Sequence, residues 1–531
     1  MSESPSLVSR FRRVVHNVAS GYAVLIATAV YALASVPLAL HYLSQEEFGL
    51  WGLMSSISGY LSLIDLGMSS SVARLLIDYK DDRQRGDYGS LIKTGWLVLV
   101  IQGALIFIVG WFLAPLLSTL LNIPGGLEGQ FIPLMRWQST IVALTFALRL
   151  FSHLLNAHQR LDITSYIQIA GLAITFGAQW MFFHRGTGVH SLIWATLLCT
   201  VSVGLTSWFA VWQLRFFPEK GAWGKASWKS FVELFMYGKD LFLVAVGTQL
   251  IMASQTIIIT RRLGLGAAAA WYAGTRAFNL IGQALWRIMI VSAPAFSEMM
   301  ARGEREKLEE RFKDILVISA SLSGMAAVGF AACNSLFVGL WTGLSRHQSI
   351  VWPAYNDVLL GIWMVLLTLV TCHGYLVLIS KQIRFLRVVH FIEGAVYVGI
   401  AWFLSAWGLP AMIACSVICT AFFTYCYGMW RSSRYFNKPI QQIALTWLLP
   451  TWKSTILLAP IVAFAWFIVR PLNPITRLTV LVFVSGVCGA GIMLRFGLPI
   501  ALREELARRT PGFANPLARS FMRLARTPST Q

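Results

Sequence analysis

Apolar stretches of the length that crosses a bilayer recur along the whole chain, and they constrain its fold more than any other feature. A membrane helix needs about 20 mostly apolar residues. We predict fourteen spans, at 18–42, 48–72, 94–120, 131–156, 163–184, 189–213, 238–260, 268–297, 314–340, 355–379, 387–407, 410–430, 455–470 and 477–495. The expected fold class is therefore an all-α polytopic membrane protein.

The composition agrees with this layout and excludes two other classes. Of 531 residues, 56% are hydrophobic and only 12% are charged, whereas soluble domains have about 25% charged residues. A soluble globular enzyme is excluded by the low charge, and a disordered chain is excluded by the high hydrophobicity. The net charge of +20 could indicate a polyanionic partner, so its distribution along the chain decides its meaning.

The basic residues lie mostly on one side of the predicted membrane. If the N-terminus is cytoplasmic, 32 of the 43 Lys and Arg residues fall in inside segments and six in outside loops. The positive-inside rule then predicts an even number of spans, with both termini cytoplasmic. Most of the excess charge is explained by orientation, so we expect no nucleic-acid partner. Segments 7–18 and 516–526 fit either basic amphipathic helices on anionic membrane lipid or solvated tails.

Two polar breaks divide the spans into groups of six, six and two. We predict seven parts: a cytoplasmic N-terminal segment (1–17), an N-terminal six-helix bundle (18–213), a cytoplasmic linker (214–237), a C-terminal six-helix bundle (238–430), a cytoplasmic loop (431–454), helices 13 and 14 (455–495) and a basic cytoplasmic tail (496–531). Segment 42–51 aligns weakly with 262–271, at the same place in each bundle. A repeat of six spans preserves orientation, so we expect a pseudo-two-fold axis along the membrane normal.

The eighth predicted span carries the clearest polar face. Arg276, Asn279, Gln283 and Arg287 follow helical spacing, and Glu298 lies near the same side two to three turns later. An intramembrane arginine costs about 2.5–3.5 kcal/mol on insertion scales. The two arginines therefore face a wet, substrate-binding cavity or form a structural pair, for example Arg287 with Glu298 or Asp65.

Other spans supply further candidates. In the second span Asp65 shares a face with several serines, including Ser62, and it can serve as a counter-ion, a proton site or a helix-packing hydrogen bonder. The candidate substrate contacts are the four residues of the eighth span together with Tyr31 in the first span, Ser62 in the second and Arg149 in the fourth. Snorkelling explains Arg149 equally well. The candidate ion-coupling residues are Asp65, Asp240, Glu298 and Glu393.

No motif for catalysis or cofactor binding occurs. The sequence lacks a phosphate-binding loop, a His-Glu-x-x-His zinc motif and a Gly-x-Ser-x-Gly elbow. The seven cysteines all lie in apolar stretches and form no Cys-x-x-Cys pair. We therefore expect no enzyme activity, no cofactor and no metal.

Two stretches resemble a known family. The first is an acidic-aromatic-Gly turn, Glu46-Glu47-Phe48-Gly49, followed by a second span that ends near Asp65-Leu66-Gly67; the second is Arg262-Leu263-Gly264 with the segment 271–276. These patterns are similar to those of bacterial polysaccharide flippases of the Wzx type, in the multidrug/oligosaccharidyl-lipid/polysaccharide (MOP) exporter superfamily. The family often has an aspartate before the Arg-x-Leu-Gly turn, where this chain has Gln255 and Thr256.

The resemblance implies a substrate. Arg276 falls where the fourteen-span lipid II flippases place a cavity arginine, which implies contact with a lipid pyrophosphate. No arginine occurs between Arg13 and Arg74, so the additional cavity arginines of those proteins have no counterpart. The resemblance therefore implies an undecaprenyl-linked oligosaccharide other than lipid II.

We expect a transporter that flips this lipid across the bacterial inner membrane for O-antigen, capsule or exopolysaccharide synthesis. A polysaccharide polymerase or chain-length regulator would be a fitting partner. Three alternatives stay open: a cation-coupled multidrug antiporter of the same superfamily, a membrane glycosyltransferase or polymerase, and a scaffold in an envelope-assembly complex. The short outside loops count against the enzyme.

Overall fold

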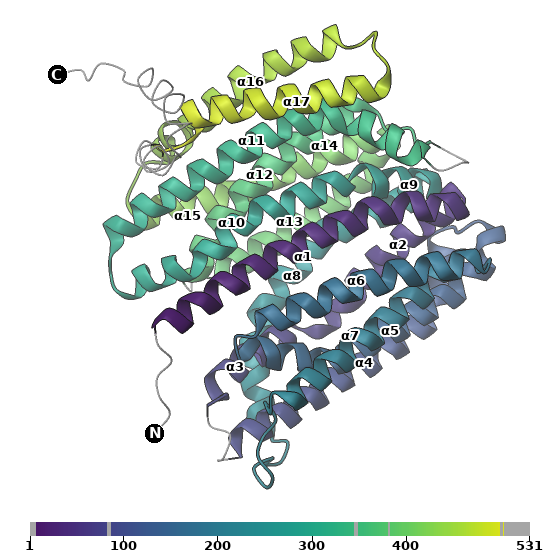
Figure 1. The fold of residues 1–531 in the computed structure, drawn as a ribbon, viewed down its shortest axis with the longest axis vertical. Coiled ribbons are helices and arrows are strands. Elements are labelled where there is room, and N and C mark those ends of the chain that lie inside the picture. The colour runs from purple at the N-terminus through teal and green to yellow at the C-terminus, as the bar shows by residue number, and fades with distance from the viewer. Residues whose placement is uncertain (1–6, 82–85, 345–348, 381–382, 500–502, 504–531) are drawn as a thin grey trace. The chain divides into compact units, whose positions relative to one another are not determined.

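The computed structural model describes residues 7–81, 86–344, 349–380, 383–499 and 503, and every regular element in this part of the chain is a helix (Figure 1). Contacts between helices divide the chain into two compact units. Unit 1 comprises Met1–Tyr272 with Leu344–Gln348, and unit 2 comprises Ala273–Gly343 with Ser349–Gln531.

Unit 1 contains eight long helices, a 3₁₀ turn and the first part of a ninth helix. They are α1 (Leu7–Tyr42), α2 (Gln45–Leu61), η1 (Ser62–Asp65), α3 (Met68–Tyr79), α4 (Asp87–Leu120), α5 (Gly125–Ala157), α6 (Leu161–His184), α7 (His190–Gln213), α8 (Trp228–Leu263) and the beginning of α9 (Leu265–Gly274). Helix α5 packs against α4 and α7, and α6 packs against α7 and α1.

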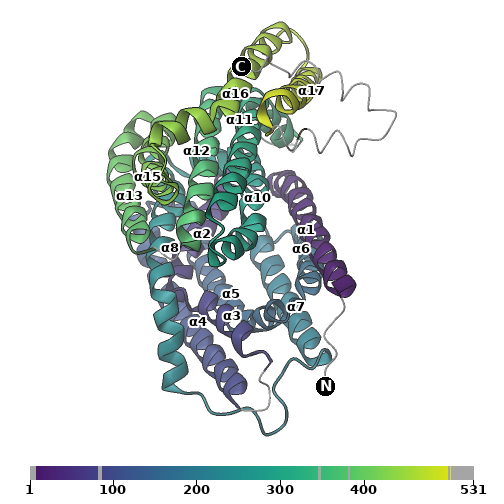
Figure 2. The same cartoon turned by 90° about the vertical axis from the view of Figure 1, so that its left-hand side faces the viewer.

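Helix α8 packs against α2, α3 and α4, and so it belongs to unit 1 (Figure 2). The predicted six-helix bundle that begins at residue 238 also includes this helix, and that division into bundles stays a prediction. The boundary between the units follows Tyr272.

The number of spans agrees with the sequence prediction. Thirteen helices in the described part of the chain are long and apolar enough to cross a membrane, and the bent pair formed by α2 and α3 raises the number to fourteen. The chain is thus a multi-pass membrane protein. Helix α1 begins at Leu7, within the segment predicted to precede the first span. The tail segment 516–526 lies outside the described residues.

The second span is interrupted, whereas the sequence predicted one continuous helix over 48–72. Segments 45–65 and 68–79 meet at an angle of 52°. Leu66 and Gly67 both adopt left-handed backbone conformations, with φ of 49° and 74°. A Cβ on Gly67 would overlap the carbonyl of Gly238 in α8, so only glycine fits both the conformation and the close approach.

Unit 2 is organised around α11. Its elements are the end of α9, α10 (Arg276–Ala301), α11 (Arg305–Gly343), α12 (Ala354–Ile379), α13 (Ile383–Leu404), η2 (Ser405–Trp407), α14 (Leu409–Thr420), the π-helical η3 (Ala421–Tyr425), α15 (Cys426–Phe436), η4 (Gln442–Trp447), α16 (Leu449–Ile468), α17 (Pro474–Ile492) and η5 (Met493–Gly497). Helix α11 contacts α10, α12, α16 and α17, and the last two lie side by side (Figure 1).

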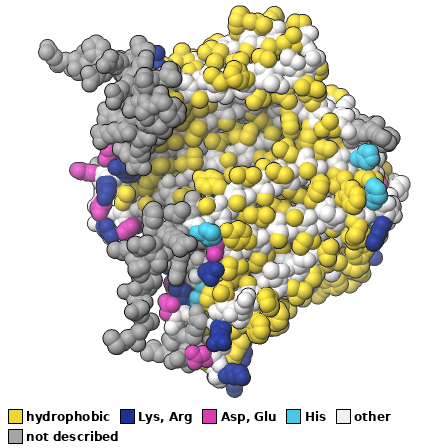
Figure 3. Space-filling model, in the orientation of Figure 1, with side chains coloured by type: hydrophobic (Ala, Val, Ile, Leu, Met, Phe, Trp, Pro, Cys, Tyr) yellow, Lys and Arg dark blue, Asp and Glu magenta, His cyan; other side chains and the backbone are white. Residues whose placement is uncertain are grey.

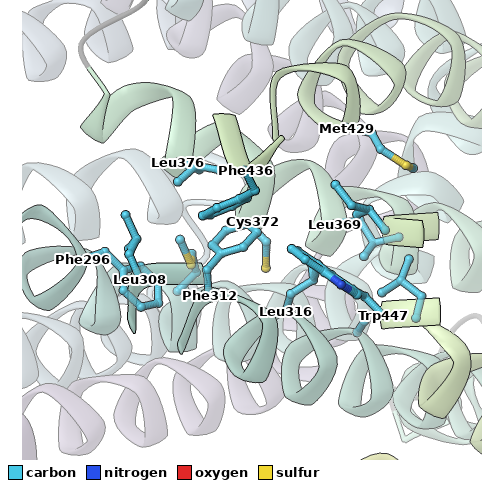
Figure 4. Close-up of a cluster of buried hydrophobic side chains, with 14 residues drawn as sticks. Phe296, Leu308, Phe312, Leu316, Leu369, Cys372, Leu376, Met429, Phe436 and Trp447 are labelled. Carbon is cyan, nitrogen blue, oxygen red and sulfur yellow. The ribbon is translucent and has the colours of Figure 1, made fainter. Parts of the chain in front are cut away.

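A cluster of buried apolar side chains joins α10, α11, α12, α15 and η4 (Figure 4). Phe312 of α11 lies at its centre, with its ring 6.2 Å from that of Phe296 and 5.4 Å from that of Phe436. The ring of Trp447 in η4 is tilted by 58° relative to that of Phe436, and the two ring centres lie 5.9 Å apart. Because lipid is as apolar as these side chains, close packing rather than the hydrophobic effect stabilises such contacts within the membrane.

Large apolar side chains point outward along the spans, as a lipid-facing surface requires (Figure 3). Phe112, Phe403, Phe464 and Phe483 are each between 67% and 75% exposed. In the view of Figure 3, charged side chains gather at the margins of a largely hydrophobic face. Such a distribution is typical of a protein that spans a membrane.

Candidate functional site

The polar face predicted on the eighth span lies on α10 of unit 2. Helix α10 begins at Arg276, directly after Thr275, which interrupts the span between α9 and α10. Asn279 and Gln283 are exposed, and Arg276 and Arg287 are half-buried. The four side chains lie three to four residues apart, so they form one polar stripe along the helix.

Glu298 lies at the other end of α10 and is engaged locally. Its carboxylate is 2.5 Å from the guanidinium of Arg302, one turn later, and both side chains are more than half exposed. The sequence considered a pair between Glu298 and Arg287; the structure pairs Glu298 with Arg302 instead. In the turn that follows, a hydrogen bond from Lys307 lowers the pKa of the Glu304 carboxyl.

A second polar cluster lies at the break in the second span, in unit 1. The Asp65 carboxylate accepts hydrogen bonds from the backbone N–H of Ser69 at 3.0 Å and from its hydroxyl at 2.6 Å. Asp65 thereby caps the first turn of α3, where a negative charge is favourable. The Arg149 guanidinium donates to the same Ser69 hydroxyl at 3.2 Å. Ser69 therefore links two residues that the sequence predicted separately.

Neighbouring side chains in unit 1 contact both Asp65 and Arg149. Gln102 of α4 donates to the backbone carbonyl of Asp65 at 2.7 Å, and Arg149 lies 4.4 Å from the ring centre of Phe146. Among the three roles weighed for Asp65, its proximity to Arg149 favours the counter-ion. The serine-rich face predicted along the second span does not continue past Asp65, because the left-handed residues Leu66 and Gly67 separate η1 from α3.

Two predicted substrate contacts are engaged within unit 1. The Tyr31 hydroxyl of α1 accepts a hydrogen bond from the Gln179 side chain of α6 at 2.9 Å. The Ser62 hydroxyl donates to the carbonyl of Ser58, four residues earlier, at 2.9 Å. Tyr31 thus joins two helices, and Ser62 satisfies the backbone at the end of α2. Their roles toward a substrate stay predictions.

Among the candidate coupling residues with described side chains, Glu393 is the most deeply buried, with 1% of the residue exposed. Its carboxyl group lies in α13 and hydrogen-bonds the hydroxyls of Thr420 and Thr424, on both sides of the junction between α14 and η3. The side chain of Asp240 lies outside the described residues. Within the described ranges, no group of three or more His, Cys, Asp and Glu side chains could hold a metal ion.

The sequence analysis missed a buried carboxylate in unit 2. Asp357, in the first turn of α12, is fully buried and accepts hydrogen bonds from Asn334 and Trp352. The available signal was an acidic residue near the start of an apolar span, which is a functional candidate by default. Gln102 and Gln179 were also missed, since amides in apolar helices are common and only their partners distinguish them.

Comparison with known families gives one match over more than half of the chain. The model of the family described as "Polysaccharide biosynthesis protein" matches residues 38–350. This range covers the second through ninth predicted spans, and both stretches that carry the family resemblance. No curated protein matches the sequence significantly.

Solved structures of transporters share the fold. An inward-facing multidrug resistance MATE family transporter of the MOP superfamily aligns with a TM-score of 0.65 and 15% identity, over 77% of this chain and 96% of its own. The lipid II flippase MurJ in an inward closed conformation aligns with a TM-score of 0.64 and 12% identity, over 90% and 99%. A MOP superfamily transporter from Pyrococcus furiosus aligns with a TM-score of 0.52 and 15% identity, over 80% and 95%.

Proposed function

Because the chain belongs to the family of polysaccharide biosynthesis proteins and has the MOP transporter fold, we propose that it flips an undecaprenyl-pyrophosphate-linked oligosaccharide from the cytoplasmic to the periplasmic leaflet. The product would serve O-antigen, capsule or exopolysaccharide synthesis. In this proposal the chain lies in the bacterial inner membrane with both termini cytoplasmic, and it is a transporter rather than an enzyme.

The barrier to this reaction is the head group. A pyrophosphate and a large sugar lose their hydration when they enter hydrocarbon, whereas the polyprenyl tail stays in lipid throughout. A protein lowers this barrier if it replaces water around the anion with charged hydrogen-bond donors. Arginine suits the task, because its planar fork binds phosphate oxygens through paired hydrogen bonds.

The polar stripe on α10 is the observation that supports the proposal best. Arg276 and Arg287 place two positive charges within one apolar span, and exposed Asn279 and Gln283 lie between them. Arg276 also stands at the first position of α10, directly after the interruption at Thr275. We assign the pyrophosphate to Arg276 and Arg287, and sugar hydroxyls to the two amides.

An energy source for uphill transport would act through a carboxylate. Of the candidates with described side chains, Asp65 lies near Arg149 and Glu298 pairs with Arg302. Glu393 is buried among hydroxyl groups, a setting that suits reversible binding of a proton or of sodium. Glu393→Gln should abolish the dependence of transport on an ion gradient, while Glu298→Gln should preserve it.

Substitution of Arg276 tests the proposal. Arg276→Ala should abolish export of surface polysaccharide at normal protein level, and Arg276→Lys should restore it in part, since lysine keeps the charge but not the paired donors. Arg185→Ala, at an exposed arginine between α6 and α7, is the matched control and should export normally. Normal export by Arg276→Ala would refute the pyrophosphate role.

A cation-coupled multidrug antiporter is the second candidate, favoured by the structural similarity to the MATE family transporter. Such a protein needs carboxylates and aromatic rings toward its load, whereas the α10 stripe is basic. Thermal shifts of the purified protein separate the two functions. Stabilisation by farnesyl pyrophosphate and not by tetraphenylphosphonium supports the flippase, and the reverse result supports the antiporter.

A further inference from the structure

A buried polar cluster in unit 2, formed by Asn334, Trp352 and Asp357, contacts the backbone directly before α10. The side-chain amide of Asn334, in α11, donates to the backbone carbonyl of Gly274 at 3.0 Å and to the carboxylate of Asp357 at 2.7 Å. The indole N–H of Trp352 donates to the same carboxylate oxygen at 2.6 Å. Asp357 therefore orients both groups that contact the end of α9.

Gly274 is held by close packing as well as by the hydrogen bond to its carbonyl. A Cβ at this position would lie 2.5 Å from the ring of Trp352, so the indole is packed directly against the backbone. Trp352 is buried, with 5% of the residue exposed. Its segment is tied to α11, because the N–H of Ile350 donates to the Thr342 hydroxyl at 3.0 Å.

Arg276 lies two residues after Gly274, whose carbonyl accepts the hydrogen bond from Asn334. A helix turns by about 100° per residue, so a small change of backbone direction at Gly274 or Thr275 rotates the whole stripe of α10. Freed backbone groups inside a membrane must also find partners on neighbouring helices. The Asn334 amide supplies such a partner, and it does so at the position from which α10 takes its direction.

We propose that Asp357 is a positioning residue for Arg276. Through Asn334 and Trp352 it fixes the interruption at Gly274 and Thr275, and thereby the face on which α10 presents its arginine. Asp357 itself makes no contact with substrate in this proposal. The link to substrate binding rests on the proposed function, whereas the link to the direction of α10 does not.

Variants of Asp357 and Trp352 distinguish the effect of the carboxylate charge from the effect of its hydrogen bonds. Asp357→Asn keeps an oxygen that accepts from both donors and should behave like the parent protein. Asp357→Ala removes the acceptor and leaves two buried donors without it, which is costly. Trp352→Phe removes one donor and keeps the ring against Gly274, so it provides a milder variant if Asp357→Ala fails to fold.

The first measurement reports the direction of α10 without any substrate. Cysteine is introduced at exposed Asn279 or at buried Phe278, and maleimide labelling in native membranes is quantified by peptide mass spectrometry, which separates these sites from the native cysteines. Asp357→Ala should lower the ratio of the labelling rate at 279 to that at 278 by about fivefold, a free-energy change of roughly 1 kcal/mol. An unchanged ratio in Asp357→Ala and Trp352→Phe overturns the proposal.

The second measurement is a double-mutant cycle on binding of farnesyl pyrophosphate, with farnesol as the probe that lacks the anion. Asp357→Ala should weaken binding about tenfold in the parent protein and leave it unchanged in an Arg276→Ala background. Equal weakening in both backgrounds overturns a role through Arg276. If Arg276→Ala alone does not weaken binding while the labelling ratio still responds to Asp357→Ala, the pyrophosphate assignment fails and the positioning role stands.

Discussion

The second and eighth spans are both interrupted, but they present opposite charges at the break. In the second span the carboxylate of Asp65 caps the new helix, and an arginine from α5 reaches it through Ser69. In the eighth span the new helix begins with Arg276, and the nearby carboxylate of Asp357 is bonded to the neutral donors of Asn334 and Trp352. One break places its arginine beside a carboxylate, whereas the other places Arg276 at the first position of the new helix.

The two breaks also differ in what maintains them, which is backbone conformation in the second span and side-chain contacts in the eighth. The second span bends by 52° at two left-handed residues, so the bend follows from the backbone conformation of those two residues. The eighth span continues from Leu265 to Ala301 as one candidate span. Its interruption is contacted by side chains from α11 and from the segment before α12. A break maintained by side chains can respond to substitution elsewhere, which makes the two spans separable by mutation.

The largest expected difference concerns anion binding. Arg276→Ala should weaken farnesyl pyrophosphate binding by about tenfold to a hundredfold, since hydrogen bonds to charged groups contribute about 1.5–3 kcal/mol. Arg149→Ala should weaken it by less than about threefold, because its charge already faces Asp65. Isothermal titration of both variants checks this, and equal losses would show that both breaks bind the anion.

The next effect concerns stability. Gly67→Ala should destabilise the protein by about 3 kcal/mol or more, because strain at positive φ adds to overlap with the backbone of Gly238. Gly274→Ala should cost less, about 1–3 kcal/mol, since its φ is not positive and the added Cβ overlaps a side-chain ring rather than backbone. Gly125→Ala is the control, because no atom lies within 4 Å of the added Cβ. Thermal denaturation in detergent ranks the three variants by their loss of stability. A larger loss of stability for Gly274→Ala than for Gly67→Ala would contradict the prediction.

A smaller effect tests the counter-ion role of Asp65. Asp65→Asn should destabilise the protein by about 1–2 kcal/mol, because it removes the charge that caps α3 and balances Arg149. In an Arg149→Ala background the same substitution should cost less, since the partner charge is gone. A double-mutant cycle on thermal stability measures the difference. Identical costs in the two backgrounds would leave Asp65 as a helix cap alone.

The smallest effect is expected at Glu298. Its ion pair with Arg302 is largely exposed, and exposed pairs contribute about 0–1 kcal/mol. Glu298→Gln should therefore change the melting temperature only slightly. A strong loss of transport with unchanged stability would instead restore Glu298 as an ion-coupling residue.

Much of the fold was predictable because lipid imposes a simple rule on sequence. Each span must be apolar over about 20 residues, so the fourteen segments could be identified from residue types alone, as could the stripe from Arg276 to Arg287. The continuous second span was predicted wrongly. Its break depends on a left-handed Leu66, which no local pattern marks, and on the approach of Gly238, a residue about 170 positions away.

The candidate site divides in the same way. The sequence identified Asp65 and Arg149 as polar residues in apolar spans, but it could not bring them together, because their contact depends on how α3 packs against α5. It identified Arg276 and missed Asp357, whose importance lies entirely in what it contacts.

By itself the sequence determined that this chain crosses the membrane about fourteen times and carries two arginines on one face of one span. The tertiary structure decided where the spans are interrupted and which charges are balanced. The reason is physical: insertion into lipid depends on the composition of each segment alone, whereas a helix break or a buried carboxylate persists only when groups on other helices satisfy it.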